Sequence, residues 1–464
     1  MSLHIFDSVK KTKLTFEPIQ GNDVKVYVCG PTVYDDAHLG HARSAIVFDL
    51  LHRVLKENGY NVTMTKNFTD IDDKIIKKMA QTNQTLDEVT QFYINSYKND
   101  MAILNVLPNT LEPKATQNLE AMIEMISGLL DENKAYIIDD GVYFDTSKDK
   151  SYGSLSHKKD EQNTQARVEQ NTQKRDQKDF ALWKFNDDIS FNAPFGKGRP
   201  GWHIECSAMI DRHLAYHDKE FAIDIHGGGA DLLFPHHENE ASQTRCSKNQ
   251  ELAKYWMHNG FVNINGEKMS KSLGNSFFLK DALDLYDGEV IRFYMISTHY
   301  RADFSYSIED LESSKKRLDK IFRLKKRVYG ISSSEVNKDF EKNIMESLND
   351  DLNTSKALAY IDEYISEVND TLDKEPKNKN LKKQIVATLD FISNTLGIGI
   401  KDPYEYFQFG IDQSTKEQIE SLILQRNIAK QEKNYELSDI IRAKIIDMGI
   451  SIMDTPNGTL WEKV

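Results

Sequence analysis

Hydrophobic positions near the start of the chain follow two different periods. Val24, Val26 and Val28 recur at every second residue, which predicts a buried strand, and a Gly-Pro turn follows at residues 30–31. From His38 to Gly59 the apolar residues recur at helical spacing instead. Residues 61–66 return to a strand pattern, so the first 66 residues predict a β-α-β unit.

The middle of the chain continues this mixture of strands and helices. Helical patterns are expected over 86–133, and buried strands over 142–144 and 221–225. If residues 202–206 are extended, they place Trp202 and Cys206 on one face. A helix is expected to start at Pro235, where His236 and Glu240 share a face while His237 and Glu238 point elsewhere.

The last third of the chain reads as helical from about residue 303. The segment 314–328 is a strongly basic helix, whose simplest interpretation is a solvated face. Further helices are expected over 415–433 and 436–448, followed by a small β-hairpin that includes 457–461. Residues 158–178 carry almost no large apolar side chains, which is typical of an exposed insertion.

Composition narrows the class of protein. The 464 residues suffice for two to four domains, and 39% hydrophobic with 28% charged residues is typical of a soluble protein. No apolar run reaches the roughly 20 residues of a membrane helix, and the N-terminus lacks a signal-peptide pattern, so a cytoplasmic location is expected. The net charge of −13 argues against indiscriminate nucleic-acid binding but permits a local basic track.

Two places combine polar residues with the ends of predicted strands. A strand, a turn and the start of a helix at His38, Gly40 and His41 would form an anion site, and the alternative is a solvated loop with a helix cap. Thr69 and Asp70 end the next strand and are candidates for the same crevice, with helix capping as the alternative.

A third polar stretch follows the strand at 221–225. Its three glycines allow close backbone approach to a ligand, and Asp231 can accept hydrogen bonds, although a flexible turn would look the same. The loop at 268–275 carries Lys268 and Lys271, and alone it would be read as a solvated loop.

The three cysteines are far apart, so a disulfide framework is not expected. Cys29 and Cys206 lie beside the richest motifs, and thiolate, imidazole and carboxylate are all zinc ligands. Spacing alone favours buried, unreactive cysteines, because no Cys-x-x-Cys pair is present.

Two motifs in order resemble the signature pair of class I aminoacyl-tRNA synthetases: His38-Leu39-Gly40-His41 and Lys268-Met269-Ser270-Lys271-Ser272. Within that class, the chain resembles the cysteinyl-tRNA synthetase family. The segments that carry this likeness are 29–34, 68–74, 198–209, 224–240 and 273–275, with Asp439, Arg442 and 458–461 in the tail.

The resemblance implies an α/β fold class, in which a Rossmann-type parallel-sheet catalytic domain with an insertion precedes a helical bundle and a small C-terminal α+β anticodon-binding domain. The implied boundaries are 1–303 for the catalytic domain with its insertion at about 95–195, then 304–400 and 401–464. A monomer is expected.

The resemblance also implies an activity: ATP-dependent ligation of L-cysteine to tRNA-Cys through a cysteinyl-adenylate. One Zn²⁺ per chain would bind Cys29, Cys206, His236 and Glu240 and select the substrate thiolate. Mg²⁺ would accompany ATP. Four protein ligands exceed the usual three of catalytic zinc, so we expect a fifth ligand or a loosened one when cysteine binds.

The resemblance assigns the remaining roles residue by residue. ATP would contact His38, Gly40, His41 and Lys271, with Lys268 among the catalytic residues. Cysteine would contact Thr69, Trp202 and Asp231. The anticodon candidates are Lys430, Tyr435, Asp439 and Asp454, although core packing is an equal alternative for Tyr435.

Two rival functions remain open at this stage. A cysteine ligase that acylates an amino sugar would share the catalytic core but lack the tail beyond Asp402. A non-catalytic, zinc-stabilised RNA-binding protein would not need intact phosphate-binding signatures.

Overall fold

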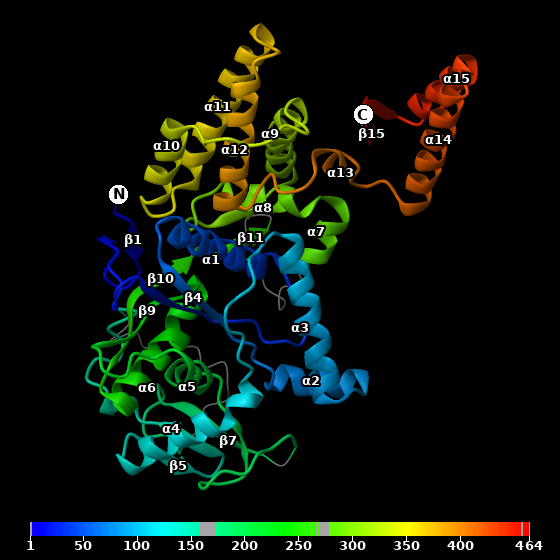
Figure 1. The fold of residues 1–464 in the computed structure, drawn as a ribbon. Coiled ribbons are helices and arrows are strands. Elements are labelled where there is room, and N and C mark those ends of the chain that lie inside the picture. The colour runs from blue at the N-terminus through cyan, green and yellow to red at the C-terminus, as the bar shows by residue number, and fades with distance from the viewer. Residues whose placement is uncertain are drawn as a thin grey trace. The chain divides into compact units, whose positions relative to one another are not determined.

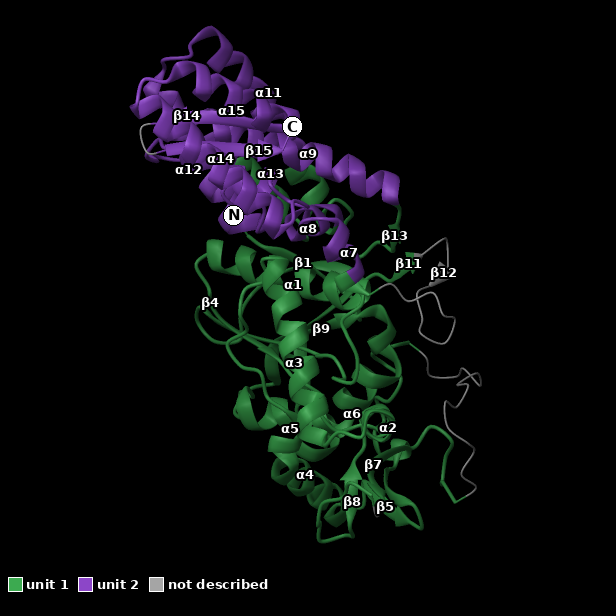
Figure 2. Cartoon of the chain, turned by 90° about the vertical axis from the view of Figure 1, so that its right-hand side faces the viewer, with its two compact units in different colours: residues 1–280, 295–307, 342–358 green, residues 281–294, 308–341, 359–464 purple. Residues whose placement is uncertain are grey.

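The computed structural model describes residues 2–157, 173–186, 188–264, 267–268, 278–455 and 458–463. The chain divides into two compact units (Figure 2). The first comprises Met1–Lys280, Met295–Ser307 and Lys342–Leu358, and the second comprises Asp281–Tyr294, Ile308–Glu341 and Ala359–Val464. Figure 1 labels the elements for which there is room, and each unit is described by itself.

A four-stranded parallel sheet forms the centre of the first unit, in the order β10-β9-β3-β4. Its strands are β3 (Asp23–Val28), β4 (Asn61–Lys66), β9 (Phe221–Gly229) and β10 (Glu251–Asn259). Val24, Val26 and Val28 are buried in the inner strand β3, as expected where helices cover both faces of a parallel sheet. Helix α1 (Leu39–Glu57) connects β3 to β4, which confirms the predicted β-α-β unit.

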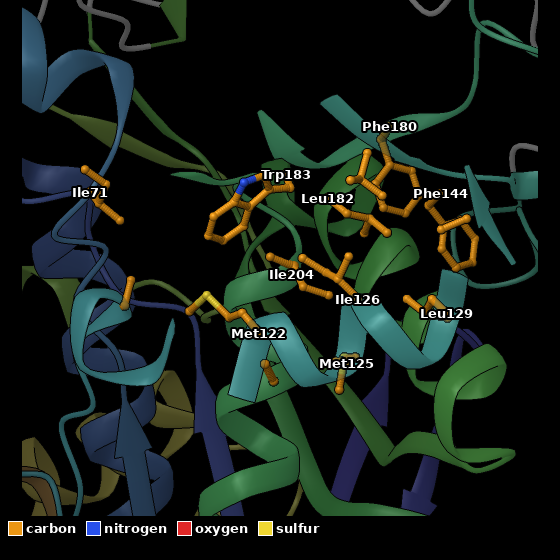
Figure 3. Close-up of a cluster of buried hydrophobic side chains, with 14 residues drawn as sticks. Ile71, Met122, Met125, Ile126, Leu129, Phe144, Phe180, Leu182, Trp183 and Ile204 are labelled. Carbon is orange, nitrogen blue, oxygen red and sulfur yellow. The ribbon is translucent and has the colours of Figure 1, made fainter. Parts of the chain in front are cut away.

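A second, antiparallel sheet in the order β5-β6-β7-β8 belongs to the same unit. Its strands are β5 (Ala135–Ile138), β6 (Gly141–Phe144), β7 (Phe180–Phe185) and β8 (Gly198–Pro200), and helix α4 (Leu119–Asp131) precedes them. Met122 and Ile126 of α4 point toward Leu182 and Trp183 of β7 in one buried apolar cluster (Figure 3). Helix α4 and this sheet therefore share a core of their own.

The other elements of the first unit flank these two sheets. They are β1 (His4–Asp7), β2 (Thr12–Thr15), α2 (Asp73–Thr82), α3 (Leu86–Ile103), α5 (Ile204–His213), α6 (Glu238–Lys248), β11 (Val262–Ile264), β12 (Glu267–Lys268) and β13 (Phe304–Tyr306), with single turns at Ala115–Asn118, Thr146–Lys148, Ala230–Leu232 and Leu233–His237. Strands β11 and β12 pair antiparallel, and residues 265 and 266 between them lie outside the described residues. Most of the predicted insertion, residues 158–172, lies outside them as well.

Two expectations about local structure were wrong. Residues from Ile204 onward form helix α5 rather than an extended segment. A π-helical turn at Leu233–His237 precedes α6, which begins at Glu238 rather than at Pro235. Phe234 has φ −141° and ψ 132° inside that turn, so ordinary helical spacing does not apply there.

Helices dominate the second half of the chain. They are α7 (Leu279–Leu285), α8 (Gly288–Ile296), α9 (Ile308–Arg327), α10 (Lys338–Leu348), α11 (Thr354–Lys374), α12 (Lys379–Leu396), α13 (Pro403–Phe407), α14 (Gln413–Gln431) and α15 (Tyr435–Asp447). A hairpin of β14 (Ile450–Thr455) and β15 (Gly458–Lys463) ends the chain. Ile423, Ile445 and Trp461 pack together in a small core of the tail.

The predicted fold class is confirmed: a parallel α/β sheet with an insertion, then helices, then a small α+β tail. None of the helices that the structure describes is both long and apolar enough to cross a bilayer.

Candidate active site and metal centre

Four buried side chains from separate elements meet beyond the carboxyl end of β3. Cys29 directly follows β3, Cys206 lies in α5, His236 lies in the π-helical turn and Glu240 lies in α6. One ligand atom from each lies within 4.8 Å of every other. The set proposed from the sequence is therefore brought together.

The separations fit a tetrahedral zinc ion. With Zn–S near 2.3 Å and Zn–N near 2.0 Å, two sulfurs lie about 3.8 Å apart and a sulfur lies about 3.5 Å from a nitrogen. Cys29 Sγ is 3.7 Å from Cys206 Sγ, and Cys206 Sγ is 3.7 Å from His236 Nε2. Only His236 Nε2 and Glu240 Oε1, at 2.8 Å, are closer than two ligands of one ion.

Two aromatic neighbours hold His236 in place. His203 Nδ1 lies 3.0 Å from His236 Nδ1, so His236 presents Nε2 to the cluster. The Trp202 ring stacks on His236 at 4.1 Å between centroids and 20°. Hydrogen bonding to the second ring nitrogen is how proteins fix the tautomer of a metal-binding histidine.

Further histidines surround the cluster, and the sequence analysis missed them. His237 Nε2 lies 3.3 Å from Cys29 Sγ, so the expectation that His237 points elsewhere was wrong, because the π-helical turn rotates it inward. His226 Nε2 lies 2.7 Å from Glu240 Oε2, and His258 Nε2 lies 2.8 Å from His237 Nδ1. Cys29, His226, His237 and Glu240 form a second group of converging ligand atoms.

The charged groups of this buried cluster stabilise one another. Burial opposes ionisation of Glu240, but His236 and His226 outweigh it and hold the pKa of Glu240 well below its usual range. Burial also opposes the charge on His236, yet Glu240 and Cys206 raise the pKa of His236 to about 10. The pKa of Cys206 falls to about 7 although burial would raise it, because Cys29 and His236 stabilise the thiolate. A buried carboxylate and an easily ionised thiol suit a cation.

Thr69 lies at the edge of this cluster rather than in a helix cap. Its hydroxyl donates to Glu205 Oε2 at 2.6 Å, and Asp72 is the residue that caps α2. Glu205 is buried, which raises its pKa well above the usual range. Asp70 was expected to face the same crevice, but its carboxylate accepts hydrogen bonds from Thr116 N at 2.8 Å and Thr116 Oγ1 at 2.6 Å.

The close approach of the chain after β3 to the chain after β4 requires a glycine at position 30. A Cβ atom on Gly30 would lie 1.6 Å from the Asn67 carbonyl oxygen, and Gly30 N donates to Asn67 Oδ1 at 2.8 Å. Close approach of these two strand ends brings Cys29 and Thr69 to one place. Asp231 follows β9 at the same edge of the sheet and is exposed.

The two signature histidines cap their own helix. His41 N donates to His38 Nδ1 and His38 N to His41 Nδ1, both at 3.3 Å. The rings stack at 3.6 Å between centroids and 15°. The two histidines therefore do form a helix cap, as the alternative interpretation held. The cap places both rings, with Gly40, at the positive end of α1.

The residues that follow the loop at 268–275 contact the segment around His38. Phe278 forms an antiparallel bridge with His38, and Leu279 N donates to Ala37 O at 2.8 Å. The Lys280 ammonium contacts the Asp36 carboxylate. We call these three contacts the loop anchor. Lys268 lies in β12 with its side chain outside the described residues, and Lys271 lies outside them altogether.

The basic helix α9 uses many of its charges internally. Its Arg317 binds Asp362, Lys326 binds Glu462, and Lys325 donates to three backbone carbonyl oxygens. Three exposed cations on one face have no ion pair or hydrogen bond among the described residues: Lys316, Lys320 and Arg323. We call them the α9 basic stripe.

The anticodon candidates divide into two pairs. Asp454 accepts from Arg426 at 2.8 and 2.9 Å and also pairs with Lys430. Tyr435 has 64% of its surface exposed, which rules out core packing for it. Asp439 is exposed four residues later on α15, so it shares a face with Tyr435.

Comparison with known proteins places this site in a class. Residues 15–316 match the model of the tRNA synthetases class I (C) catalytic domain, and residues 343–401 match that of the DALR domain. A Mycobacterium tuberculosis methionyl-tRNA synthetase bound by methionyl-adenylate shares the fold, with a TM-score of 0.60 at 13% identity over 81% of this chain and 92% of that chain. The fold and site define a class I aminoacyl-tRNA synthetase.

Closer relatives identify the family. The cysteine–tRNA ligase of Aliarcobacter butzleri is 68% identical over 465 residues, covering 100% of both chains. The cysteine–tRNA ligase of Nitratiruptor sp. is 61% identical, covering 99% of this chain and 100% of its own length, and that of Helicobacter hepaticus is 53% identical, covering 99% of both. The chain belongs to the cysteine–tRNA ligase family, which confirms the resemblance seen in the sequence.

Proposed function

We propose that this chain uses ATP to form cysteinyl-adenylate and then transfers the cysteine to tRNA-Cys. Relatives named cysteine–tRNA ligase match the whole chain, including the tail, at up to 68% identity. The observation that carries the proposal is the convergence of the two thiols, His236 and Glu240 within one buried cluster. The tail also argues against the amino-sugar ligase, which would lack it.

The cluster would hold one Zn²⁺ through Cys29, Cys206, His236 and Glu240. Bound zinc would stabilise the thiolate of cysteine in preference to the hydroxyl of serine. A site that demands one ligand atom can discriminate by roughly 10⁴ or more. His203 and Trp202 hold the imidazole of His236 in the orientation this requires.

Thr69, Trp202 and Asp231 would form the rest of the cysteine site. Thr69 is fixed by its hydrogen bond to Glu205, and Trp202 lies directly against His236. Exposed Asp231, just past β9, is suited to the substrate ammonium.

ATP, with Mg²⁺, would bind at the N-terminus of α1 through His38, Gly40 and His41. Adenylate formation needs positioning and charge stabilisation more than a protein nucleophile. Lys268 and Lys271 would supply positive charge to the leaving pyrophosphate from the loop whose described end meets His38.

The role of Lys271 gives a direct prediction. Lys271→Ala should lower the rate of adenylate formation much more than it raises the Kd for cysteine, because the charge is needed as pyrophosphate departs. Single-turnover kinetics and equilibrium binding of cysteine separate the two effects. Equal losses in both would contradict this role.

The α9 basic stripe would track tRNA phosphates, and the tail would bind the anticodon. Tyr435 and Asp439 offer an exposed ring and an acceptor on one helix face, the combination that stacks on and hydrogen-bonds to unpaired bases. Lys430 and Asp454 already pair with each other, so their contribution would need that pair to open or to act as a unit.

The decisive experiment combines metal analysis with cysteine-dependent ATP–pyrophosphate exchange on the purified chain, with serine as competitor. We expect about one zinc per chain, exchange with cysteine, and none with serine. A zinc-free chain with full activity would overturn the role proposed for zinc. No exchange with cysteine would overturn the proposed activity and revive the non-catalytic RNA-binding alternative. The domain boundaries at 303 and 400, the monomeric state and the cytoplasmic location remain proposals that limited proteolysis, sedimentation and fractionation can test.

A further inference from the structure

A cavity of about 230 Å³ lies between α1, α3, β4 and the segment 106–112. Its walls are largely apolar and include Phe48, Met64 and Met101. None of the residues assigned above to zinc, cysteine or ATP lines it. Tyr97 lies between the two sites, because it lines the cavity and its ring centroid is 6.4 Å from that of His41.

The acidic groups of the cavity are already satisfied. Asp49 accepts from Arg53 Nε at 2.8 Å and from Leu107 N at 2.7 Å. Glu112 accepts from Asn109 Nδ2 at 3.0 Å and pairs with Lys98. Neither carboxylate therefore needs a cation from a ligand.

The Lys66 ammonium is in the opposite situation. Lys66 is 7% exposed and lines the cavity, and no residue that the structure describes makes a hydrogen bond or ion pair with its side chain. Among those residues, the Lys66 ammonium makes a cation–π contact with the Tyr97 ring, with Nζ 5.5 Å from the ring centroid. An ammonium without a partner on the wall of a largely apolar cavity favours an anion in that cavity.

We propose that this cavity binds a small monocarboxylate with an apolar body, whose carboxylate pairs with Lys66. A cavity of about 150 Å³ accepts benzene, so this one has room for a ring and a carboxylate. One unpaired ammonium balances one negative charge, whereas a phosphate dianion would face Asp49 and Glu112 on the same walls. The apolar body would rest on Phe48 and Met101.

Calorimetric titration of the purified full-length chain with three probes of similar shape tests this. Benzoate should bind. Benzyl alcohol should bind at least about tenfold more weakly, because it lacks the charge-assisted hydrogen bond that the carboxylate makes to Lys66. Benzylamine, whose charge has the same sign as that of Lys66, should not bind. Lys66→Met should weaken benzoate binding by about 10- to 100-fold. Ala45→Leu, which fills the cavity from α1, should abolish it even if Lys66→Met fails to fold.

Lys56→Met is the control for loss of a lysine charge, because Lys56 is exposed near the end of α1 and does not line the cavity. It should leave benzoate binding unchanged. Saturating ATP and cysteine should not displace benzoate. No saturable heat from benzoate below about 10 mM, unchanged binding in Lys66→Met or Ala45→Leu, equal binding of benzyl alcohol, or displacement by ATP or cysteine would each overturn the proposal.

Discussion

Replacing His203 with phenylalanine removes its hydrogen bond to His236 and keeps its ring packing. His203 Nδ1 lies 3.0 Å from His236 Nδ1, and its ring packs against Phe180 at 5.4 Å and Trp202 at 5.2 Å between centroids. Phenylalanine keeps a ring in this place but removes the nitrogen. Burial lowers the pKa of His203 well below its usual value, so the neutral ring can accept a hydrogen bond from His236.

Two independent estimates give the size of the effect. A buried donor left without its acceptor costs about 1–3 kcal/mol. Loss of a partner that orients a metal ligand typically weakens metal binding 10- to 100-fold, which corresponds to about 1.4–2.7 kcal/mol. We therefore expect His203→Phe to raise the Kd for zinc by one to two orders of magnitude.

Competition with a chromophoric chelator measures that Kd on the full-length chain, independently of catalysis. His203→Asn retains an acceptor and should lose less affinity than His203→Phe. His213→Phe at the last residue of α5 is the matched control, because His213 contacts Asn118 rather than the cluster. If His203→Phe binds zinc as tightly as the unsubstituted chain, His203 does not orient a zinc ligand.

Three further predictions concern the loop anchor and the second unit. Lys280→Met should slow ATP–pyrophosphate exchange by up to about fivefold with little change in Tm, because an exposed ion pair is worth at most about 1 kcal/mol; an equal loss in Lys13→Met, which breaks a pair elsewhere, would show a nonspecific effect. Glutamine at all three positions of the α9 basic stripe should reduce the salt dependence of tRNA binding, log K against log salt, by about 2, and an unchanged slope would remove the stripe from the tRNA interface. Arg426 holds the pKa of Asp454 below its usual value, so the contribution of the ionised Asp454 to stability is present above about pH 4 and is lost as the pH falls. Asp454→Asn should remove this acid dependence from amide exchange in β14–β15, and an identical pH profile in the variant would refute the prediction.

The sequence predicted the elements more fully than it predicted the contacts between them. The β-α-β unit and the tail helices followed from apolar periodicity, because each buries one continuous face. Cys29, Cys206, His236 and Glu240 come from four separate elements. Their meeting depends on tertiary packing, so spacing alone favoured inert cysteines and only the family resemblance pointed to a shared site.

The errors had local physical causes. His237 was assigned away from the site because regular helical spacing was assumed across a π-helical turn. Asp70 was a candidate for the crevice because it follows a strand, but its carboxylate is occupied by two hydrogen bonds from Thr116, which the sequence could not show. The basic segment of α9 could not be divided in advance into paired and unpaired cations, because partners such as Asp362 lie far away in the sequence.

Because His38 and His41 cap α1 with their own side chains, alanine at either position removes a helix-starting interaction as well as an imidazole. Cap removal alone costs about 1 kcal/mol, so an alanine variant mixes a frayed helix with altered nucleotide chemistry. At His38, the N-cap residue, asparagine serves as a cap without offering a protonatable ring and would separate the two. Kinetic loss in an asparagine variant of normal thermal stability can be ascribed to the imidazole itself.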